Sequence, residues 1–120
     1  MTAIYGVLGN ADIDASEDVA VIDTEERKSL FLSFTVSVTL TAFTVEFAVS
    51  HVSDYFTVAS AAVDFTAPEG FVLAASGDLT GAAGGATVHW LKLDVSGMKR
   101  VRIKAASTNC VLVGHYTLGD

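Results

Sequence analysis

The chain is poor in cysteine and in basic residues, and each shortage excludes a class of protein. Its single cysteine, Cys110, cannot form a disulfide within the chain, so we expect a small buried thiol. Among its 120 residues, 7 Lys and Arg face 14 Asp and Glu, which gives a net charge of −7. Nucleic acid is therefore not expected as a partner, because phosphate binding needs a basic surface.

Long apolar runs are also missing. No segment reaches the roughly 18 apolar residues of a membrane helix, so no membrane partner is expected. The first residues lack a basic stretch followed by an apolar run, so we expect no signal peptide and no Sec-type export.

Residues able to carry chemistry are present but are not grouped. His51, His89 and His115 lie far apart, and no nucleophile elbow or thiol-enzyme signature occurs. We expect no enzyme, no catalytic residue and no cofactor. The segment Gly77–Gly85 has four glycines in nine residues but lacks the Lys and Ser/Thr of a phosphate loop, so it predicts a mobile tip between strands.

Oxygen-bearing side chains alternate from Asp12 to Asp18, as they do in a calcium loop. Glu17 stands where such a loop requires glycine, and Asp23 stands where it requires glutamate. A solvated acidic loop is the better interpretation, and no metal is expected.

The strongest pattern in the chain runs from Leu30 to Val49. Apolar residues occupy every second position from Leu30 to Leu40, and only Phe31 departs from the alternation. The parity changes near Thr41, after which Phe43, Val45, Phe47 and Val49 are the apolar set. We predict two long strands joined as an antiparallel hairpin, with a core formed by Phe34, Val36, Val38, Val45 and Phe47.

Shorter strand patterns follow the same alternation elsewhere. They occur at Val19–Val21, Phe56–Val58, Ala62–Phe65, Phe71–Ala74, Val88–Val95, Val101–Ala105 and Cys110–Leu118, and no convincing helix pattern interrupts them. The sequence predicts one all-β domain over residues 1–120. Its fold class is an antiparallel β-sandwich of Greek-key or jelly-roll type, with about seven to nine short strands.

Three segments could bind a partner. The apolar cluster at Ile4–Leu8 precedes an acidic run, so residues 1–18 are interpreted as an N-terminal arm that docks on another subunit or on the capsid. The alternative is that Ile4–Leu8 is the first strand of the sandwich. Trp90 could anchor a subunit contact, stack on a sugar or cover the rim of its own core. A basic strand could be a solvated face, or could meet acid from this subunit or a neighbour. The candidate partner-binding residues are Ile4, Tyr5, Val7, Leu8, Trp90, Arg100, Arg102 and Lys104.

The C-terminal third resembles a known group of proteins. The segments His89–Gly97, Val101–Ala105 and Val113–Tyr116 look like those of small β-sandwich virion structural proteins of tailed bacteriophages, of the capsid decoration or cement type. This resemblance implies a structural role, oligomerisation and assembly in the host cytoplasm.

The expected function is therefore that of a non-enzymatic virion protein that decorates or cements a capsid. Its expected partners are copies of itself, with a trimer as one option, and a major capsid protein or another virion protein. The alternative is a carbohydrate-binding β-sandwich module with Trp90 and either Tyr116 or Tyr55 as stacking groups.

Overall fold

The computed structural model describes residues 3–49, 56–60 and 71–120, and within these ranges every regular element is a strand. The strands are β1 (Ile4–Ile13), β2 (Glu17–Asp23), β3 (Ser29–Val36), β4 (Ala42–Ala48), β5 (Phe56–Ser60), β6 (Val72–Ala75), β7 (His89–Asp94), β8 (Arg100–Ala106) and β9 (Cys110–Gly119). The strand predicted at Ala62–Phe65 lies outside the described residues.

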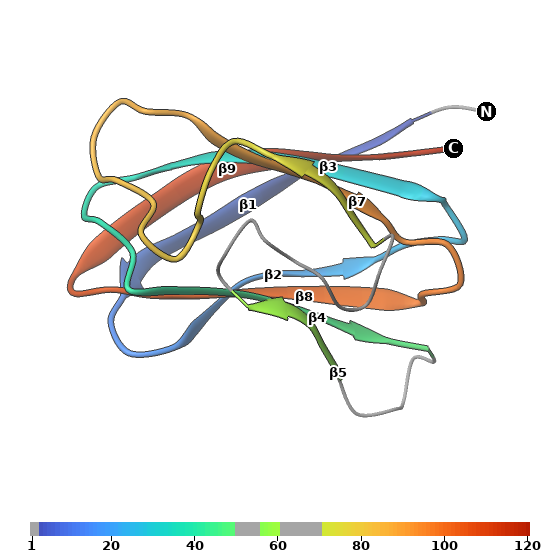
Figure 1. The fold of residues 1–120 in the computed structure, drawn as a ribbon, viewed down its shortest axis with the longest axis horizontal. Coiled ribbons are helices and arrows are strands. Elements are labelled where there is room, and N and C mark those ends of the chain that lie inside the picture. The colour runs from blue at the N-terminus through green and yellow to red at the C-terminus, as the bar shows by residue number, and fades with distance from the viewer. Residues whose placement is uncertain (1–2, 50–55, 61–70) are drawn as a thin grey trace.

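The strands form two antiparallel sheets that face each other (Figure 1). The five-stranded sheet has the order β1-β9-β3-β7-β6, and the four-stranded sheet has the order β2-β8-β4-β5. This arrangement confirms the predicted all-β sandwich. The first and last strands are neighbours, because β9 lies between β1 and β3.

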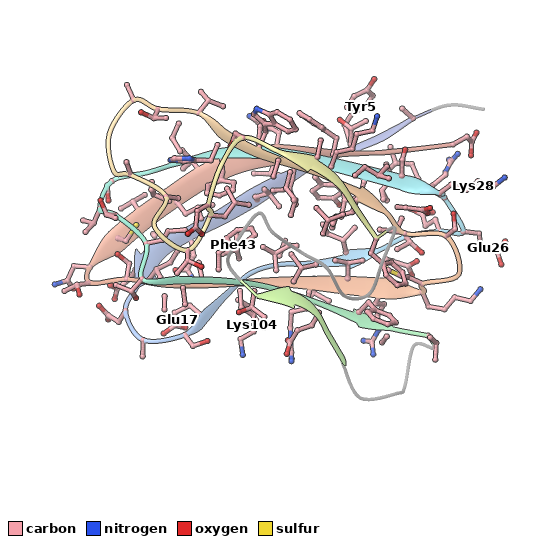
Figure 2. All side chains as sticks on the ribbon, viewed as in Figure 1. Tyr5, Glu17, Glu26, Lys28, Phe43 and Lys104 are labelled. Carbon is pink, nitrogen blue, oxygen red and sulfur yellow. The ribbon has the colours of Figure 1, made fainter. Side chains whose placement is uncertain are left out.

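The core lies between the sheets and is built by the alternating residues of each strand. Phe43 points from β4 into this interior, where its ring stacks on Phe34 of β3 at 5.3 Å between centroids (Figure 2). Phe34, Val36 and Val45 are buried as predicted, and Phe47 is half-buried. Val38 is 39% exposed, so its predicted burial is wrong: β3 ends at Val36 and the alternation does not continue beyond it.

The predicted hairpin of the two central strands is also wrong. β3 belongs to the five-stranded sheet and β4 to the four-stranded sheet, so the chain crosses between the sheets over residues 37–41. The change of parity near Thr41 serves this crossing, since a strand that changes sheets must turn its apolar face the other way to reach the same core.

The N-terminal segment is a strand of the sandwich. β1 pairs with β9 in unbroken register from Ile4 opposite Leu118 to Asn10 opposite Leu112. Leu8 and Ile13 are 1% and 0% exposed. The structure thus has the first-strand arrangement that was the alternative to a free arm.

The glycine-rich segment is packed, so its prediction as a mobile tip is wrong. Leu79 and Ala82 are buried, and the Leu40 N–H donates to the Ala82 carbonyl at 2.9 Å. At Gly84 a side chain would come within 2.9 Å of the Ser37 carbonyl oxygen, so glycine permits this close approach to the β3–β4 crossing.

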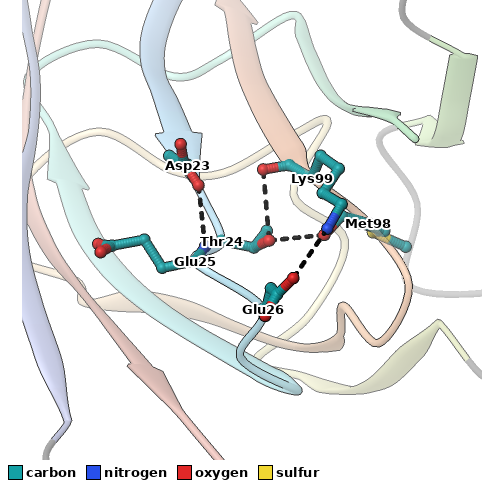
Figure 3. Close-up of polar contacts among 6 residues, drawn as sticks. All are labelled: Asp23, Thr24, Glu25, Glu26, Met98 and Lys99. Carbon is teal, nitrogen blue, oxygen red and sulfur yellow. Dashed lines mark hydrogen bonds and ion pairs between the residues drawn. The ribbon is translucent and has the colours of Figure 1, made fainter. Parts of the chain in front are cut away.

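A tight turn joins β2 to β3 at the opposite end of the sandwich. The buried Thr24 hydroxyl donates to the Met98 carbonyl at 2.6 Å, which ties this turn to the β7–β8 turn (Figure 3). Glu25 and Glu26 follow with φ values of 50° and 63°, and the Arg27 N–H donates to the Thr24 carbonyl. Two successive non-glycine residues therefore adopt the left-handed conformation, which carries an energetic cost.

Candidate functional site

The outer face of the five-stranded sheet gathers most of the exposed apolar side chains. Six of the ten large hydrophobic side chains exposed in the described residues lie on it. We define the apolar outer face by these six and the half-buried Trp90: Tyr5, Val7, Phe31, Val88, Trp90, Val111 and Val113.

Strand register explains why these residues meet. Tyr5 pairs with Thr117, which pairs with Phe31, and the next row runs from Val7 through His115 and Ser33 to Trp90. Directly paired residues of antiparallel strands project from the same side of a sheet, so each row lies on one face. Tyr5 is visible on the side of the sheet away from the core (Figure 2).

Two aromatic rings stack on each other within the apolar outer face. Phe31 stacks on Trp90 with ring centroids 5.9 Å apart and an angle of 22° between the ring planes. Phe31 is 43% exposed. Its departure from the alternation of β3 was the sequence signal for this face, and the list of predicted binding residues missed it.

A shallow hollow of about 250 Å³ lies on the same side of the sheet. It is lined by Ser33, Phe34, Thr35, Val88, Val113, Gly114 and His115. Two hydroxyls and an imidazole therefore stand beside exposed valines. This volume is below the 300–1,000 Å³ usual for ligand pockets, so it fits one small ring rather than a large ligand.

Charge is absent from the part of this face nearest β1. The outward residues of β1, β9 and β3 between Tyr5 and Val113 include no Asp, Glu, Lys or Arg. Charge begins on β7, where Lys92 pairs directly with Phe31 and Asp94 pairs with Ser29. The part of the face formed by β1, β9 and β3 thus carries no charged side chain, although the chain has a net charge of −7.

The outer face of the four-stranded sheet is charged. Arg100, Arg102 and Lys104 project from β8, and their direct partners on β2 include Asp23 for Arg100 and Asp18 for Lys104. The Arg102 guanidinium contacts the Glu46 carboxylate through Nη2 at 2.6 Å and Nε at 2.7 Å. The basic strand thus meets carboxylates of its own subunit, one of the outcomes left open by the sequence.

The structure divides the predicted partner-binding residues into three groups. Tyr5 and Val7, 76% and 73% exposed, join Trp90 on the apolar outer face. The three basic residues lie on the opposite, charged face. Ile4 and Leu8 project inward; Leu8 is buried and Ile4 packs against the core, so neither side chain is offered to a partner.

Other sequence candidates have structural roles. Cys110 is fully buried, as expected, with its thiol 3.3 Å from the Val38 carbonyl oxygen. The buried His89 ring contacts the Ala83 carbonyl oxygen at 2.9 Å, while His115 is exposed. Asp14 accepts a hydrogen bond from the Asn109 N–H. Across the described ranges, no three His, Cys, Asp or Glu side chains are grouped so as to hold a metal ion.

Comparisons with known proteins identify the fold. The chain matches no protein-family model and no curated protein sequence. The SPBc2 prophage-derived protein YomS is similar in structure, with a TM-score of 0.61 and 8% identity over 98% of this chain and 95% of YomS. The PBSX exported protein XepA has a TM-score of 0.60 at 10% identity; 98% of this chain matches only 38% of XepA.

A third similar structure is a domain of a protein with no phage in its name. The K2 cleaved adhesin domain of Lys-gingipain has a TM-score of 0.54 at 11% identity, over 99% of this chain and 89% of that domain. At such identities the likeness establishes the shared fold alone.

Among the described residues there is no helix with the length and apolar character that a membrane crossing requires.

Proposed function

We propose that this chain is a non-enzymatic structural protein of a phage particle, which decorates or cements the capsid. It does so by docking the apolar outer face on a major capsid protein or another virion protein. The observation that carries this proposal is the cluster of exposed apolar side chains on a sheet face free of charge around Tyr5, Val7 and Val113. The structural likeness to a prophage-derived protein supports the phage setting.

The chemistry of the face suits a protein surface. Contiguous exposed apolar groups mark interaction sites, because water is released when they are covered. Burying one large apolar side chain contributes about 1.5–3 kcal/mol before the costs of association. Trp and Tyr are enriched among the residues that dominate binding energy, and the Phe31–Trp90 pair loses little freedom on docking because its rings already stack.

The charged outer face contributes little to docking in this proposal. Its cations already face carboxylates of the same subunit, so a partner gains little from them. The net charge of −7 instead favours solubility of free copies before assembly. In this proposal the protein works in the virion and is assembled in the host cytoplasm.

Valine-to-lysine substitutions on the two outer faces test the docking face. Val113→Lys places a charge beside the hollow, and Val21→Lys places one on the four-stranded sheet, where Val21 is 52% exposed. Cosedimentation with particles of the phage that encodes the chain measures binding. We expect Val113→Lys to weaken binding by about tenfold or more, and Val21→Lys to leave it within about twofold. Equal binding by both variants would overturn the choice of face.

A carbohydrate-binding role is the second candidate, favoured by the Phe31–Trp90 rings beside the hydroxyl-bearing hollow. Aromatic rings that stack on sugars beside a few polar groups are typical of such sites. Tyr116 cannot share this platform, since its ring covers Gly6 on the inner side of the sheet, and Tyr55 lies outside the described residues. A glycan array tests this role: binding that Phe31→Ala and His115→Ala both abolish would support it over capsid docking.

A further inference from the structure

Strand β1 is an open edge of the five-stranded sheet. Among the strands of the described residues it pairs only with β9. The Ser37 N–H donates to the Val111 carbonyl at 2.9 Å, so the odd-numbered residues of β9 direct their backbone groups toward β3. The even-numbered residues of β9 then bond to β1, which leaves the N–H and C=O groups of Tyr5, Val7 and Gly9 at the open edge.

The other edge strands of the two sheets are protected against pairing with another chain. β2, at the edge of the four-stranded sheet, carries Glu17, Asp18 and Asp23 and has a shift in register. β6 has only four residues and also has a shift, and the register of β5 with β4 is interrupted. Charges, short length and bulges are the usual means of preventing edge-to-edge association.

β1 has none of these protections over Ile4–Asn10. Its register with β9 is unbroken there, and the segment contains no charged residue. The absence of charge at this edge allows a second copy of the chain to approach it. Two copies that each carry −7 repel over most of their surfaces, but the β1 edge and the adjoining apolar outer face bring no like charges together.

The sequence of β1 is complementary to itself in one register. If two copies align antiparallel with Val7 opposite Val7, then Tyr5 of each copy faces Gly9 of the other, and all three residues have their free backbone groups at that edge. Each large Tyr side chain thereby meets a residue without one, where an aromatic ring can cover the glycine.

We propose that a second copy of this chain pairs with β1 across a two-fold axis at Val7. The pairing joins two five-stranded sheets into one continuous sheet, with both apolar outer faces on the same side. It deepens the proposed function, since it doubles the docking surface, and it rests on that function only for its role in a particle. Pairing of two edges alone covers less than the ~1,200 Å² of a stable interface, so the free dimer is weak.

Symmetric crosslinking tests the register without any phage particle. Residues in a hydrogen-bonded antiparallel pair have Cα atoms about 5.5 Å apart, within the range that a disulfide bridges. Val7→Cys is therefore expected to form a covalent dimer under mild oxidation, while Tyr5→Cys, which faces Gly9, crosslinks about tenfold more slowly or not at all. The native Cys110 is buried and serves as the background in both variants. Equal rates, or no dimer from Val7→Cys, would overturn the proposed register.

Sedimentation of the free protein at high concentration measures its self-association and is the second test. Val7→Pro removes one N–H from the open edge, a position where proline is tolerated, and Val7→Ala retains that N–H. We expect Val7→Pro to abolish self-association and Val7→Ala to preserve it. Self-association of Val7→Pro equal to that of the parent would place the contact elsewhere. Normal particle binding by Val113→Lys, together with loss of self-association in Val7→Pro, would overturn the proposed docking face and leave the β1 pairing standing, so the two proposals fail separately.

Discussion

Replacing Gly114 with alanine is expected to destabilise the protein strongly. Gly114 lies in β9, opposite Leu8 of β1 and Phe34 of β3. An added Cβ would meet the Ser33 carbonyl oxygen and would lie 2.7 Å from the Phe34 Cβ and 2.8 Å from its Cα. Two of these three atoms belong to the backbone and none can rotate away, so β3 itself would have to move.

The expected loss follows from two opposing effects. Forcing an extra methyl group into a packed site costs about 1–3 kcal/mol, and this site lies at the upper end because backbone is displaced. Alanine also reduces the conformational entropy of the unfolded chain relative to glycine, which stabilises the folded state by about 0.4–1 kcal/mol. The net loss is about 2 kcal/mol, which lowers Tm by roughly 6–12 °C in a domain of this size.

Urea denaturation followed by circular dichroism measures this loss. Gly81→Ala is the matched control, because an added Cβ there would have no atom within 4 Å. We expect the control to be neutral or slightly stabilising. A change of less than about 0.5 kcal/mol for Gly114→Ala would show that β9 and β3 are not as close as described, and would refute the reasoning.

Three further outcomes are expected. Phe34→Ala should cost about 3–5 kcal/mol in chemical denaturation because its ring is buried on Phe43, whereas Phe31→Ala on the outer face should cost about 1 kcal/mol or less. Glu25→Gly should stabilise by about 0.5 kcal/mol because glycine adopts φ 50° without strain; Glu25→Gln, which removes the same charge, should be neutral, and equal effects would make charge the cause. Hydrogen bonds from the Ser96 N–H and the Ser96 hydroxyl, together with nearby Lys28, lower the pKa of Asp94 below 3.8, and burial partly opposes them. The ionised Asp94 carboxylate therefore stabilises the fold above pH 3.8, and this stabilisation is lost as the pH falls through the lowered pKa. Asp94→Asn should thus lose less stability than the parent as the pH falls below about 4, and parallel pH profiles would contradict this.

Alternation was sufficient to predict most strands and their inward faces. Leu91 and Leu93 of β7 are buried as the pattern required, and so are Val101 and Ile103 of β8. These residues obey a rule of period two that depends only on neighbours in the chain.

Partners in space could not be derived in the same way. The parity change after Leu40 is equally consistent with a hairpin and with a crossing between sheets. Leu79 is buried, although the glycine-rich sequence around it shows no strand or helix pattern that predicts burial. The apolar outer face depends on β9 lying between β1 and β3, which brings Tyr5 beside Thr117 and Phe31. Tyr5 and Trp90 therefore lie on a common face that the sequence alone did not reveal.

The central place of β9 has a consequence for folding. β1 and β3 are both completed by pairing with β9, so neither acquires its shared neighbour until residues 110–119 have been synthesised. Contacts between residues so distant in the chain require large loops to close, and topologies of this kind fold slowly. While the ribosome is still at work, both strands expose unpaired edges, and a nascent chain is at its most prone to aggregate in that interval. We therefore expect the five-stranded sheet to reach its native order only after β9 has been synthesised.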